Sequence, residues 1–131
     1  MRYKLFQIKD WRPNKYVFRD WETALKNNFS LDDYKVVYEG EVEDKDVDTA
    51  LEKLFVLFNV YHPEDFEGEW SMSVSDVVEL DGEYYYTDTF GFKKITDDQT
   101  FVAREVALGN MTPEQAEVDP RRSVLLQCVG R

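Results

Sequence analysis

The sequence predicts a single α+β domain in which a small antiparallel sheet packs against one or two helices. The chain of 131 residues has the length of one ordinary domain. Hydrophobic residues make up 43% of it and aromatic residues 15%, which is enough to build a core and too much for a disordered chain. Short β-rich segments alternate with helical patterns, and this mixture is typical of α+β folds. We therefore place residues 1–131 in one domain.

The amino-terminal part contains three β-rich segments. Residues 3–8 alternate loosely between apolar and polar side chains, and residues 16–18 follow a turn signal at Pro13 and Asn14. These two segments predict a first hairpin or two short strands. Residues 34–43 contain several valines and tyrosines, so they predict the next strand.

Two segments in the first half have helical spacing. Asp20 stands in an N-cap position before a short helix that should end near Asn28. The clearest helix follows, with Asp48 as its expected cap and Asn59 as its expected terminator in the left-handed conformation. We expect one broad apolar face of this helix to be buried. That face consists of Ala50, Leu51, Leu54, Phe55, Leu57 and Phe58.

A hairpin is predicted in the second half. Residues 74–80 alternate with period two and predict a strand. Asp81 and Gly82 form a strong two-residue turn signal, and residues 84–89 can return as the antiparallel partner. Gly91, between two phenylalanines, predicts a bend in a conformation that few other residues adopt.

Residues 97–131 have weaker patterns, and we expect them to form an extension packed on the domain. Asp98 stands where it can cap a helix that ends at Gly109 and Asn110, and a second short helix should begin near Thr112. Residues 123–129 are apolar and predict a final strand or a flap.

The charge distribution argues against direct binding to nucleic acid. The formal net charge is −11, and the segment between Leu54 and Phe92 contains no lysine or arginine. Binding to a nucleic-acid backbone requires cations that replace its counterions, so this segment should repel DNA and RNA. We expect a basic or nucleic-acid-binding protein as the partner instead. The acids of this segment are Glu64, Asp65, Glu67, Glu69, Asp76, Glu79, Asp81, Glu83 and Asp88.

Other compositional features bear on location, metals and cofactors. Cys128 is the single cysteine, which excludes an internal disulfide and a multi-cysteine metal site. Asp81, Glu83 and Asp88 are a weak calcium candidate, because the ordered loop of an EF-hand is absent. The sequence has no signal-peptide pattern and no run of about 18 apolar residues, so we expect a cytoplasmic protein without membrane contact. We expect no cofactor and no metal.

Short blocks of residues follow one another in a specific order through the chain. They are Phe58-Asn59, His62-Pro63, Asp65-Phe66, Gly68, residues 71–78, Asp81-Gly82, residues 85–88 and residues 90–92. In this order they resemble the YodL-like domains of small proteins from bacterial mobile elements, over residues 3–96. Glu69 and Trp70 depart from the smaller or histidine-containing junction of that family. The resemblance implies an accessory module without an agreed activity, and the family's frequent company with antirestriction genes suggests defence evasion.

An enzyme is the alternative to a binding role. His62 is the only histidine, and a small hydrolase-like enzyme would use it as a base with Asp65 or Asp76. A structural interpretation is stronger, because nothing resembles a nucleophile elbow. Asp76 and the serines beside it are expected to hydrogen-bond exposed backbone at the start of a strand.

The sequence therefore predicts a non-catalytic accessory or interaction protein, with DNA mimicry or an anti-defence activity as one form of that role. A structural domain whose acids only keep it soluble is a further alternative. The residues expected to contact a basic partner are Glu64, Asp65, Glu67, Glu69, Trp70, Glu79, Glu83 and Asp88.

Overall fold

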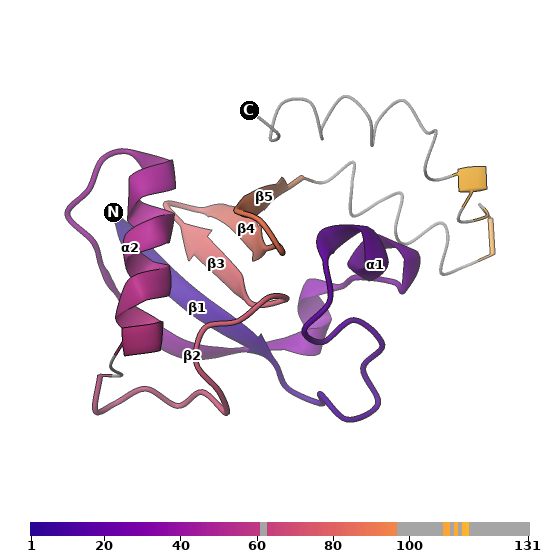
Figure 1. Cartoon of the computed structure of the whole chain (residues 1–131), viewed down its shortest axis with the longest axis horizontal. Coiled ribbons are helices and arrows are strands. Elements are labelled where there is room, and N and C mark those ends of the chain that lie inside the picture. Colours follow the sequence, from indigo (N-terminus) through magenta and orange to yellow (C-terminus); the bar gives the residue numbers. More distant parts are fainter. Residues whose placement is uncertain (61–62, 97–108, 111, 113, 116–131) are drawn as a thin grey trace.

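An antiparallel sheet is the centre of the fold. A computed structural model describes residues 1–60, 63–96, 109–110, 112 and 114–115. In this part of the chain five strands have the spatial order β2-β1-β3-β4-β5, and each neighbouring pair is antiparallel (Figure 1). The strands are β1 (Arg2–Ile8), β2 (Tyr34–Glu41), β3 (Val77–Leu80), β4 (Glu83–Thr87) and β5 (Phe92–Ile95). The helices are α1 (Trp21–Lys26), α2 (Val47–Val60) and the 3-10 turn η1 (Leu31–Asp33). The predicted α+β class is confirmed.

The two faces of the sheet are covered by different helices. Successive side chains of a strand point to opposite faces, so Val78 packs with α2 while its neighbour Val77 packs with α1. Tyr85 and Tyr86 of β4 divide in the same way. Because both faces are covered here, Val77 and Val78 are consecutive apolar residues and residues 84–86 are consecutive tyrosines, instead of a simple alternation of apolar and polar residues.

Helix α2 begins one residue after its cap, and that cap is not the predicted one. The Oδ2 atom of Asp46 accepts hydrogen bonds from the backbone N–H of Thr49 at 2.9 Å and from its hydroxyl at 2.8 Å. Asp48 lies inside the first turn, so its assignment as the cap was wrong. Asp46 satisfies an N–H group that has no partner within the helix.

The end of α2 also differs from the prediction. The helix continues through Val60, and Asn59 is not among the described residues with a positive φ. Its side-chain amide instead donates to the carbonyl oxygens of Phe55 at 2.7 Å and Met72 at 3.0 Å. Asn59 therefore ties the last turn of the helix to the segment that leads into β3.

Helix α1 is shorter than predicted. The acceptor for its first backbone N–H group is a side chain that follows β4. Asp20 occupies the N-cap position but makes no side-chain capping hydrogen bond. The Oδ1 atom of Asp88 accepts from the backbone N–H of Trp21 at 3.0 Å. The helix ends at Lys26, and Asn28 turns the chain away with a φ of 62°.

The predicted strand at residues 16–18 does not form. Tyr16 is buried in the α1 core, which is the cluster of side chains that pack between α1 and the sheet. Phe18 has a φ of 62°, which a strand does not allow. Strand β3 likewise begins at Val77 and not at residue 74, because Ser75 has a φ of 86°. Both residues leave the extended conformation at positions where the two segments meet.

The predicted hairpin is confirmed. Asp81 and Gly82 have φ values of 50° and 85°, and both values are those of the two-residue turn that matches the twist of the flanking strands. Gly91 has a φ of 73°, as the bend required. This bend leads into β5, a strand that was not predicted from the sequence.

The helices and the apolar segment expected within residues 97–131 lie almost entirely outside the described residues. His62, the base of the alternative hydrolase, also lies outside them. No helix in the described part of the chain is long and apolar enough to cross a membrane.

Candidate interaction surfaces

The acids predicted to bind a partner divide into exposed and paired groups. Glu64, Asp65 and Glu67 are exposed on the segment that connects α2 to β3. The backbone N–H of Glu67 donates to the carbonyl oxygen of Val37 at 3.0 Å, so this segment lies along the edge strand β2. Its acids are therefore held against the sheet and presented to solvent.

Other predicted acids have partners within the chain. Glu69 lies 3.9 Å from Lys35, and Glu83 lies 3.6 Å from Lys94. Asp88 accepts the hydrogen bond from Trp21 that starts α1. These side chains have structural contacts that compete with a role in binding, although exposed ion pairs of this kind contribute little stability.

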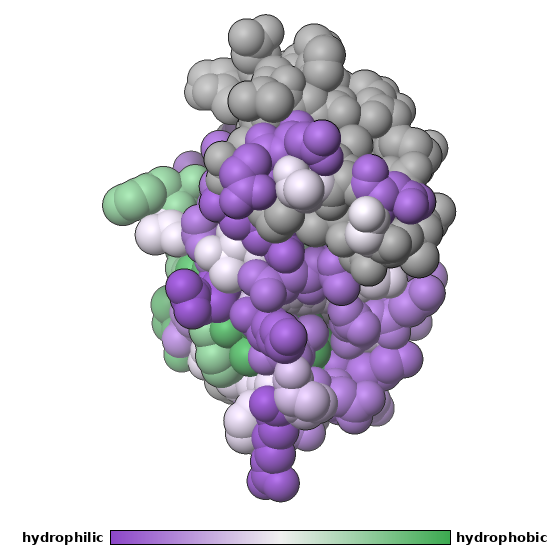
Figure 2. Space-filling model, turned by 90° about the vertical axis from the view of Figure 1, so that its right-hand side faces the viewer, coloured by the Kyte–Doolittle hydropathy of each residue, from purple (hydrophilic) through white to green (hydrophobic). Residues whose placement is uncertain are grey.

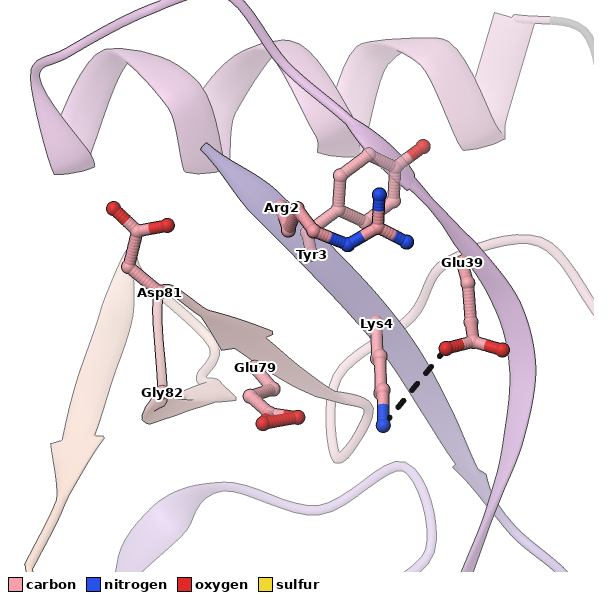
Figure 3. A pocket seen from close by; sticks show the side chains of 7 residues that line it. All are labelled: Arg2, Tyr3, Lys4, Glu39, Glu79, Asp81 and Gly82. Carbon is pink, nitrogen blue, oxygen red and sulfur yellow. Dashed lines mark ion pairs between the residues drawn. The ribbon is translucent and has the colours of Figure 1, made fainter.

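Glu79 lines a small charged hollow on β1 and its two neighbouring strands. Figure 3 shows acidic and basic side chains alternating across this surface, with Lys4 pointing toward Glu39. The Lys4 Nζ–Glu39 Oε1 distance is 3.8 Å, and Glu79 is the cross-strand partner of Lys4 on the other side. The hollow measures about 200 Å³, and its mixed charges favour neither an anionic nor a cationic ligand.

An apolar hollow of about 370 Å³ lies between α2 and the turn that joins β4 to β5. Phe55 and Phe92 pack edge to face inside it, with ring centroids 6.5 Å apart. Phe55 is 38% exposed, so the prediction that the whole apolar face of α2 is buried was wrong at this position. The lining residues are Glu52, Phe55, Val56, Thr87, Asp88, Thr89, Gly91 and Phe92.

Exposed apolar side chains extend this surface. Val56 is 57% exposed, Val60 on the same helix is 74% exposed, and Phe90 at the tip of the turn is 87% exposed. Positions 52, 56 and 60 follow one another at i, i+4 spacing and share a helix face. The helical spacing of apolar residues beyond those needed for one core was the sequence signal for this surface.

The polar side chains at the hollow include two acids and a buried hydroxyl. Glu52 and Asp88 line it, and no lysine or arginine does so among the described residues. The Thr87 hydroxyl is buried and makes no hydrogen bond within the part of the chain that is described.

A buried carboxylate lies at the same end of the sheet as this hollow, since the backbone N–H of Thr87 donates to the Asp76 carbonyl oxygen at 2.8 Å. Asp76 is fully buried, and Oδ2 accepts from the Gln7 side-chain amide at 3.0 Å and from the Ser73 backbone N–H at 2.9 Å. Its Oδ1 accepts from the indole N–H of Trp70 at 3.1 Å. Phe6 and Val77 are cross-strand partners, so Gln7 and Asp76 meet just beyond the end of that register.

Gln7 also holds the segment before β3 in place. Its Nε2 donates to the Trp70 carbonyl at 2.9 Å, and its Oε1 accepts from the Glu69 backbone N–H at 3.0 Å. A Cβ atom at Gly68 would lie 2.8 Å from that Oε1, which explains the glycine there. Sequence reasoning missed Gln7, whose only signal was a polar residue inside a strand.

The environment of Asp76 perturbs its titration. Burial raises the pKa of the Asp76 carboxyl from 3.8 to about 7, and the three N–H donors oppose this by stabilising the charged form. The predicted hydrogen bonding of Asp76 to backbone is confirmed at Ser73, but the backbone is not exposed as expected. The carboxylate is enclosed by donors and has no access to a substrate.

The weak calcium candidate is not assembled. Asp81 and Glu83 lie at one end of β4, and Asp88 follows its other end. No group of three or more potential metal-binding side chains occurs among the described residues.

A family model for the YodL-like domain matches residues 2–97, which is most of the chain. The chain belongs to the YodL-like domain family. No curated protein and no solved structure is significantly similar to it. The match includes all five described strands and both α-helices. The acidic segment after α2 and the apolar hollow therefore both belong to the YodL-like part of the chain. Trp70, which the sequence analysis assigned to partner binding, is hydrogen-bonded to the buried Asp76.

Proposed function

We propose that this YodL-like domain is a non-catalytic binding module that holds a basic protein on the apolar hollow between α2 and the β4–β5 turn. The observation that carries the proposal is an apolar surface of Phe55, Val56 and Val60 left exposed beside acidic side chains. Contiguous exposed apolar surface on a small domain is typical of a protein-interaction site.

The composition of this surface supports both affinity and selectivity. Each phenylalanine or valine side chain that becomes fully buried contributes about 1.5–3 kcal/mol relative to an exposed one. The exposed Glu52 at the hollow favours a partner with lysine or arginine at the matching position. The exposed acids of the segment after α2 extend the negative field that steers such a partner.

A catalytic role has less support. The enclosure of Asp76 by three donors leaves the proposed hydrolase without one of its two candidate acids. Whether the basic partner is a bacterial defence enzyme, and whether the acids imitate DNA, stay predictions.

The proposal is tested by capture with the full chain as bait from a bacterial lysate, followed by mass spectrometry. Val56→Asp and Val60→Asp should each lose a protein that the unsubstituted chain retains, because a charge enters the apolar contact. Val36→Asp is the matched control, since Val36 is an exposed valine on β2, outside the hollow. Retention of the same protein by all three variants would show that the hollow is not the binding site.

Charge is tested separately on the captured protein. A triple variant with Glu64→Gln, Asp65→Asn and Glu67→Gln should slow association at low salt and leave dissociation nearly unchanged. Surface plasmon resonance measures both rates. A DNA mimic would instead lose most of its affinity in this variant while tolerating Val56→Asp.

A further inference from the structure

The loop between β1 and α1, residues 9–19, has a charge opposite to that of the rest of the molecule. It contains four cations and a single acid, Asp10, in a chain whose net charge is −11. The cations are Lys9, Arg12, Lys15 and Arg19, and all four are exposed. None forms an ion pair with another described residue, whereas lysines and arginines of the sheet pair with nearby acids.

Aromatic side chains accompany these cations. Trp11 is 38% exposed and Phe18 is 48% exposed, and both pack edge to face on Trp70. The ring centroids of Phe18 and Trp70 are 4.8 Å apart, and those of Trp11 and Trp70 are 6.4 Å apart. Arg12 lies over the Trp11 ring at 5.3 Å from its centroid. We call Trp11, Phe18 and Trp70 the aromatic platform.

Hydrogen bonds to the segment before β3 hold the aromatic platform in place. The backbone N–H of Phe18 donates to the Ser75 hydroxyl oxygen at 2.9 Å, and both residues have positive φ values. The Trp70 indole donates to the buried Asp76 carboxylate. Non-glycine residues in this conformation are strained, and such strain gathers at functional sites. Rings held in this way lose little conformational freedom when a ligand binds.

A hollow that could hold a ligand lies beside the loop, and three lysines line it. A hollow of about 600 Å³ is lined by Lys9 and Lys15 of the loop, by Lys26 of α1, and by amide side chains such as Asn14. Asp10 and Asp33 also line it, and the Asp33 carboxylate accepts the Tyr16 hydroxyl at 2.7 Å. The side of the molecule that carries α1 and this loop is mostly hydrophilic (Figure 2).

We propose that residues 9–19 form a binding site for single-stranded nucleic acid. Bases stack on the partly exposed rings of Trp11 and Phe18, and the phosphates contact the four cations of the loop, which form no ion pair with the described residues. Aromatic rings interleaved with cations are suited to unpaired bases, whereas a duplex keeps its base faces covered. Trp70 and Ser75 join the loop to the acidic segment, so the four cations must attract the phosphates against the repulsion of that segment's acids. The site is separate from the apolar hollow that is proposed to bind protein.

The test is fluorescence anisotropy with the full chain and a labelled oligothymidine of about 12 nucleotides. The unsubstituted chain should bind it at low salt and quench tryptophan emission as bases stack. Four phosphate contacts predict roughly a 50-fold loss of affinity between about 50 and about 200 mM salt. A Trp11→Ala, Phe18→Ala double variant should bind about tenfold more weakly or worse.

Charge variants with matched controls complete the test. Lys9→Gln with Lys15→Gln should weaken binding and reduce the salt dependence. Lys45→Gln with Lys93→Gln removes two cations from outside the loop and should leave binding unchanged, as should Val56→Asp. Circular dichroism establishes that each variant is folded. Absence of oligothymidine binding at low salt, equal binding of duplex DNA, or capture of acidic polyglutamate in place of the oligonucleotide would each overturn the proposal.

Discussion

Two opposing effects act on the pKa of the Asp76 carboxyl. Its complete burial disfavours a charge, while three N–H donors favour one, and the result is a pKa raised to about 7. One of these donors is the indole N–H of Trp70, on which Trp11 and Phe18 pack. The Asp76 carboxylate is therefore connected to the aromatic platform through a single hydrogen bond, whose response to protonation can be measured.

Stability should depend on the pH through this residue. The folded state retains the Asp76 proton up to about pH 7, whereas the unfolded chain releases it near 3.8. Its stabilising contribution is thus complete below about pH 4, declines as the pH rises, and is lost above about pH 7. At about 1.4 kcal/mol per pKa unit, the contribution is on the order of 4 kcal/mol.

Urea unfolding between about pH 4 and about pH 8 measures this effect against an Asp76→Asn variant. The free energy of unfolding of the unsubstituted chain should fall more steeply with pH than that of the variant. The indole N–H resonance of Trp70 should also shift with a midpoint near pH 7, since protonation weakens its hydrogen bond. Parallel stability curves and a pH-independent indole resonance would contradict the assignment.

At the scale of single elements, local chemistry decided what the sequence could predict. Helix α2 and the Asp81–Gly82 hairpin followed from apolar spacing and from a turn that needs positive φ at both positions. The segment 16–18 has strand-forming residues but packs as a loop, because Tyr16 enters the α1 core. Tertiary packing overrode β propensity there, and no local signal revealed it.

The capping of α2 gives a prediction at this scale. Asp46→Ala removes both hydrogen bonds to Thr49, and we expect the free energy of unfolding to fall by about 1 kcal/mol. Asp48→Ala should cost less, because Asp48 lies within the first turn, where an acid gains about 0.3–1 kcal/mol from the helix dipole. Urea denaturation of both variants compares them, and an equal or larger loss for Asp48→Ala would restore it as the cap.

For the whole molecule, the sequence predicted the charge but not its arrangement. The run without cations between Leu54 and Phe92 was visible directly, yet the pairing of Glu69 with Lys35 and of Glu83 with Lys94 required the sheet. Gln7 and Asp76 are 69 positions apart and meet only through the β1–β3 register. Contacts of this range depend on topology, which explains why the sequence alone did not bring these side chains together.

The separation of charge predicts how the whole domain responds to salt. A net charge of −11 repels itself, whereas exposed ion pairs contribute little, so screening should favour the folded state. Raising sodium chloride from about 10 mM to about 150 mM shortens the screening length from about 30 Å to about 8 Å. We expect Tm to rise by about 3–6 °C for each 1 kcal/mol of repulsion removed.

The triple variant with Glu64→Gln, Asp65→Asn and Glu67→Gln should have a higher Tm at low salt and a smaller rise in Tm with added salt, because much of the repulsion is already gone. A Tm that falls with added salt would mean that attraction between the basic loop and the acidic remainder of the chain outweighs repulsion among the acids.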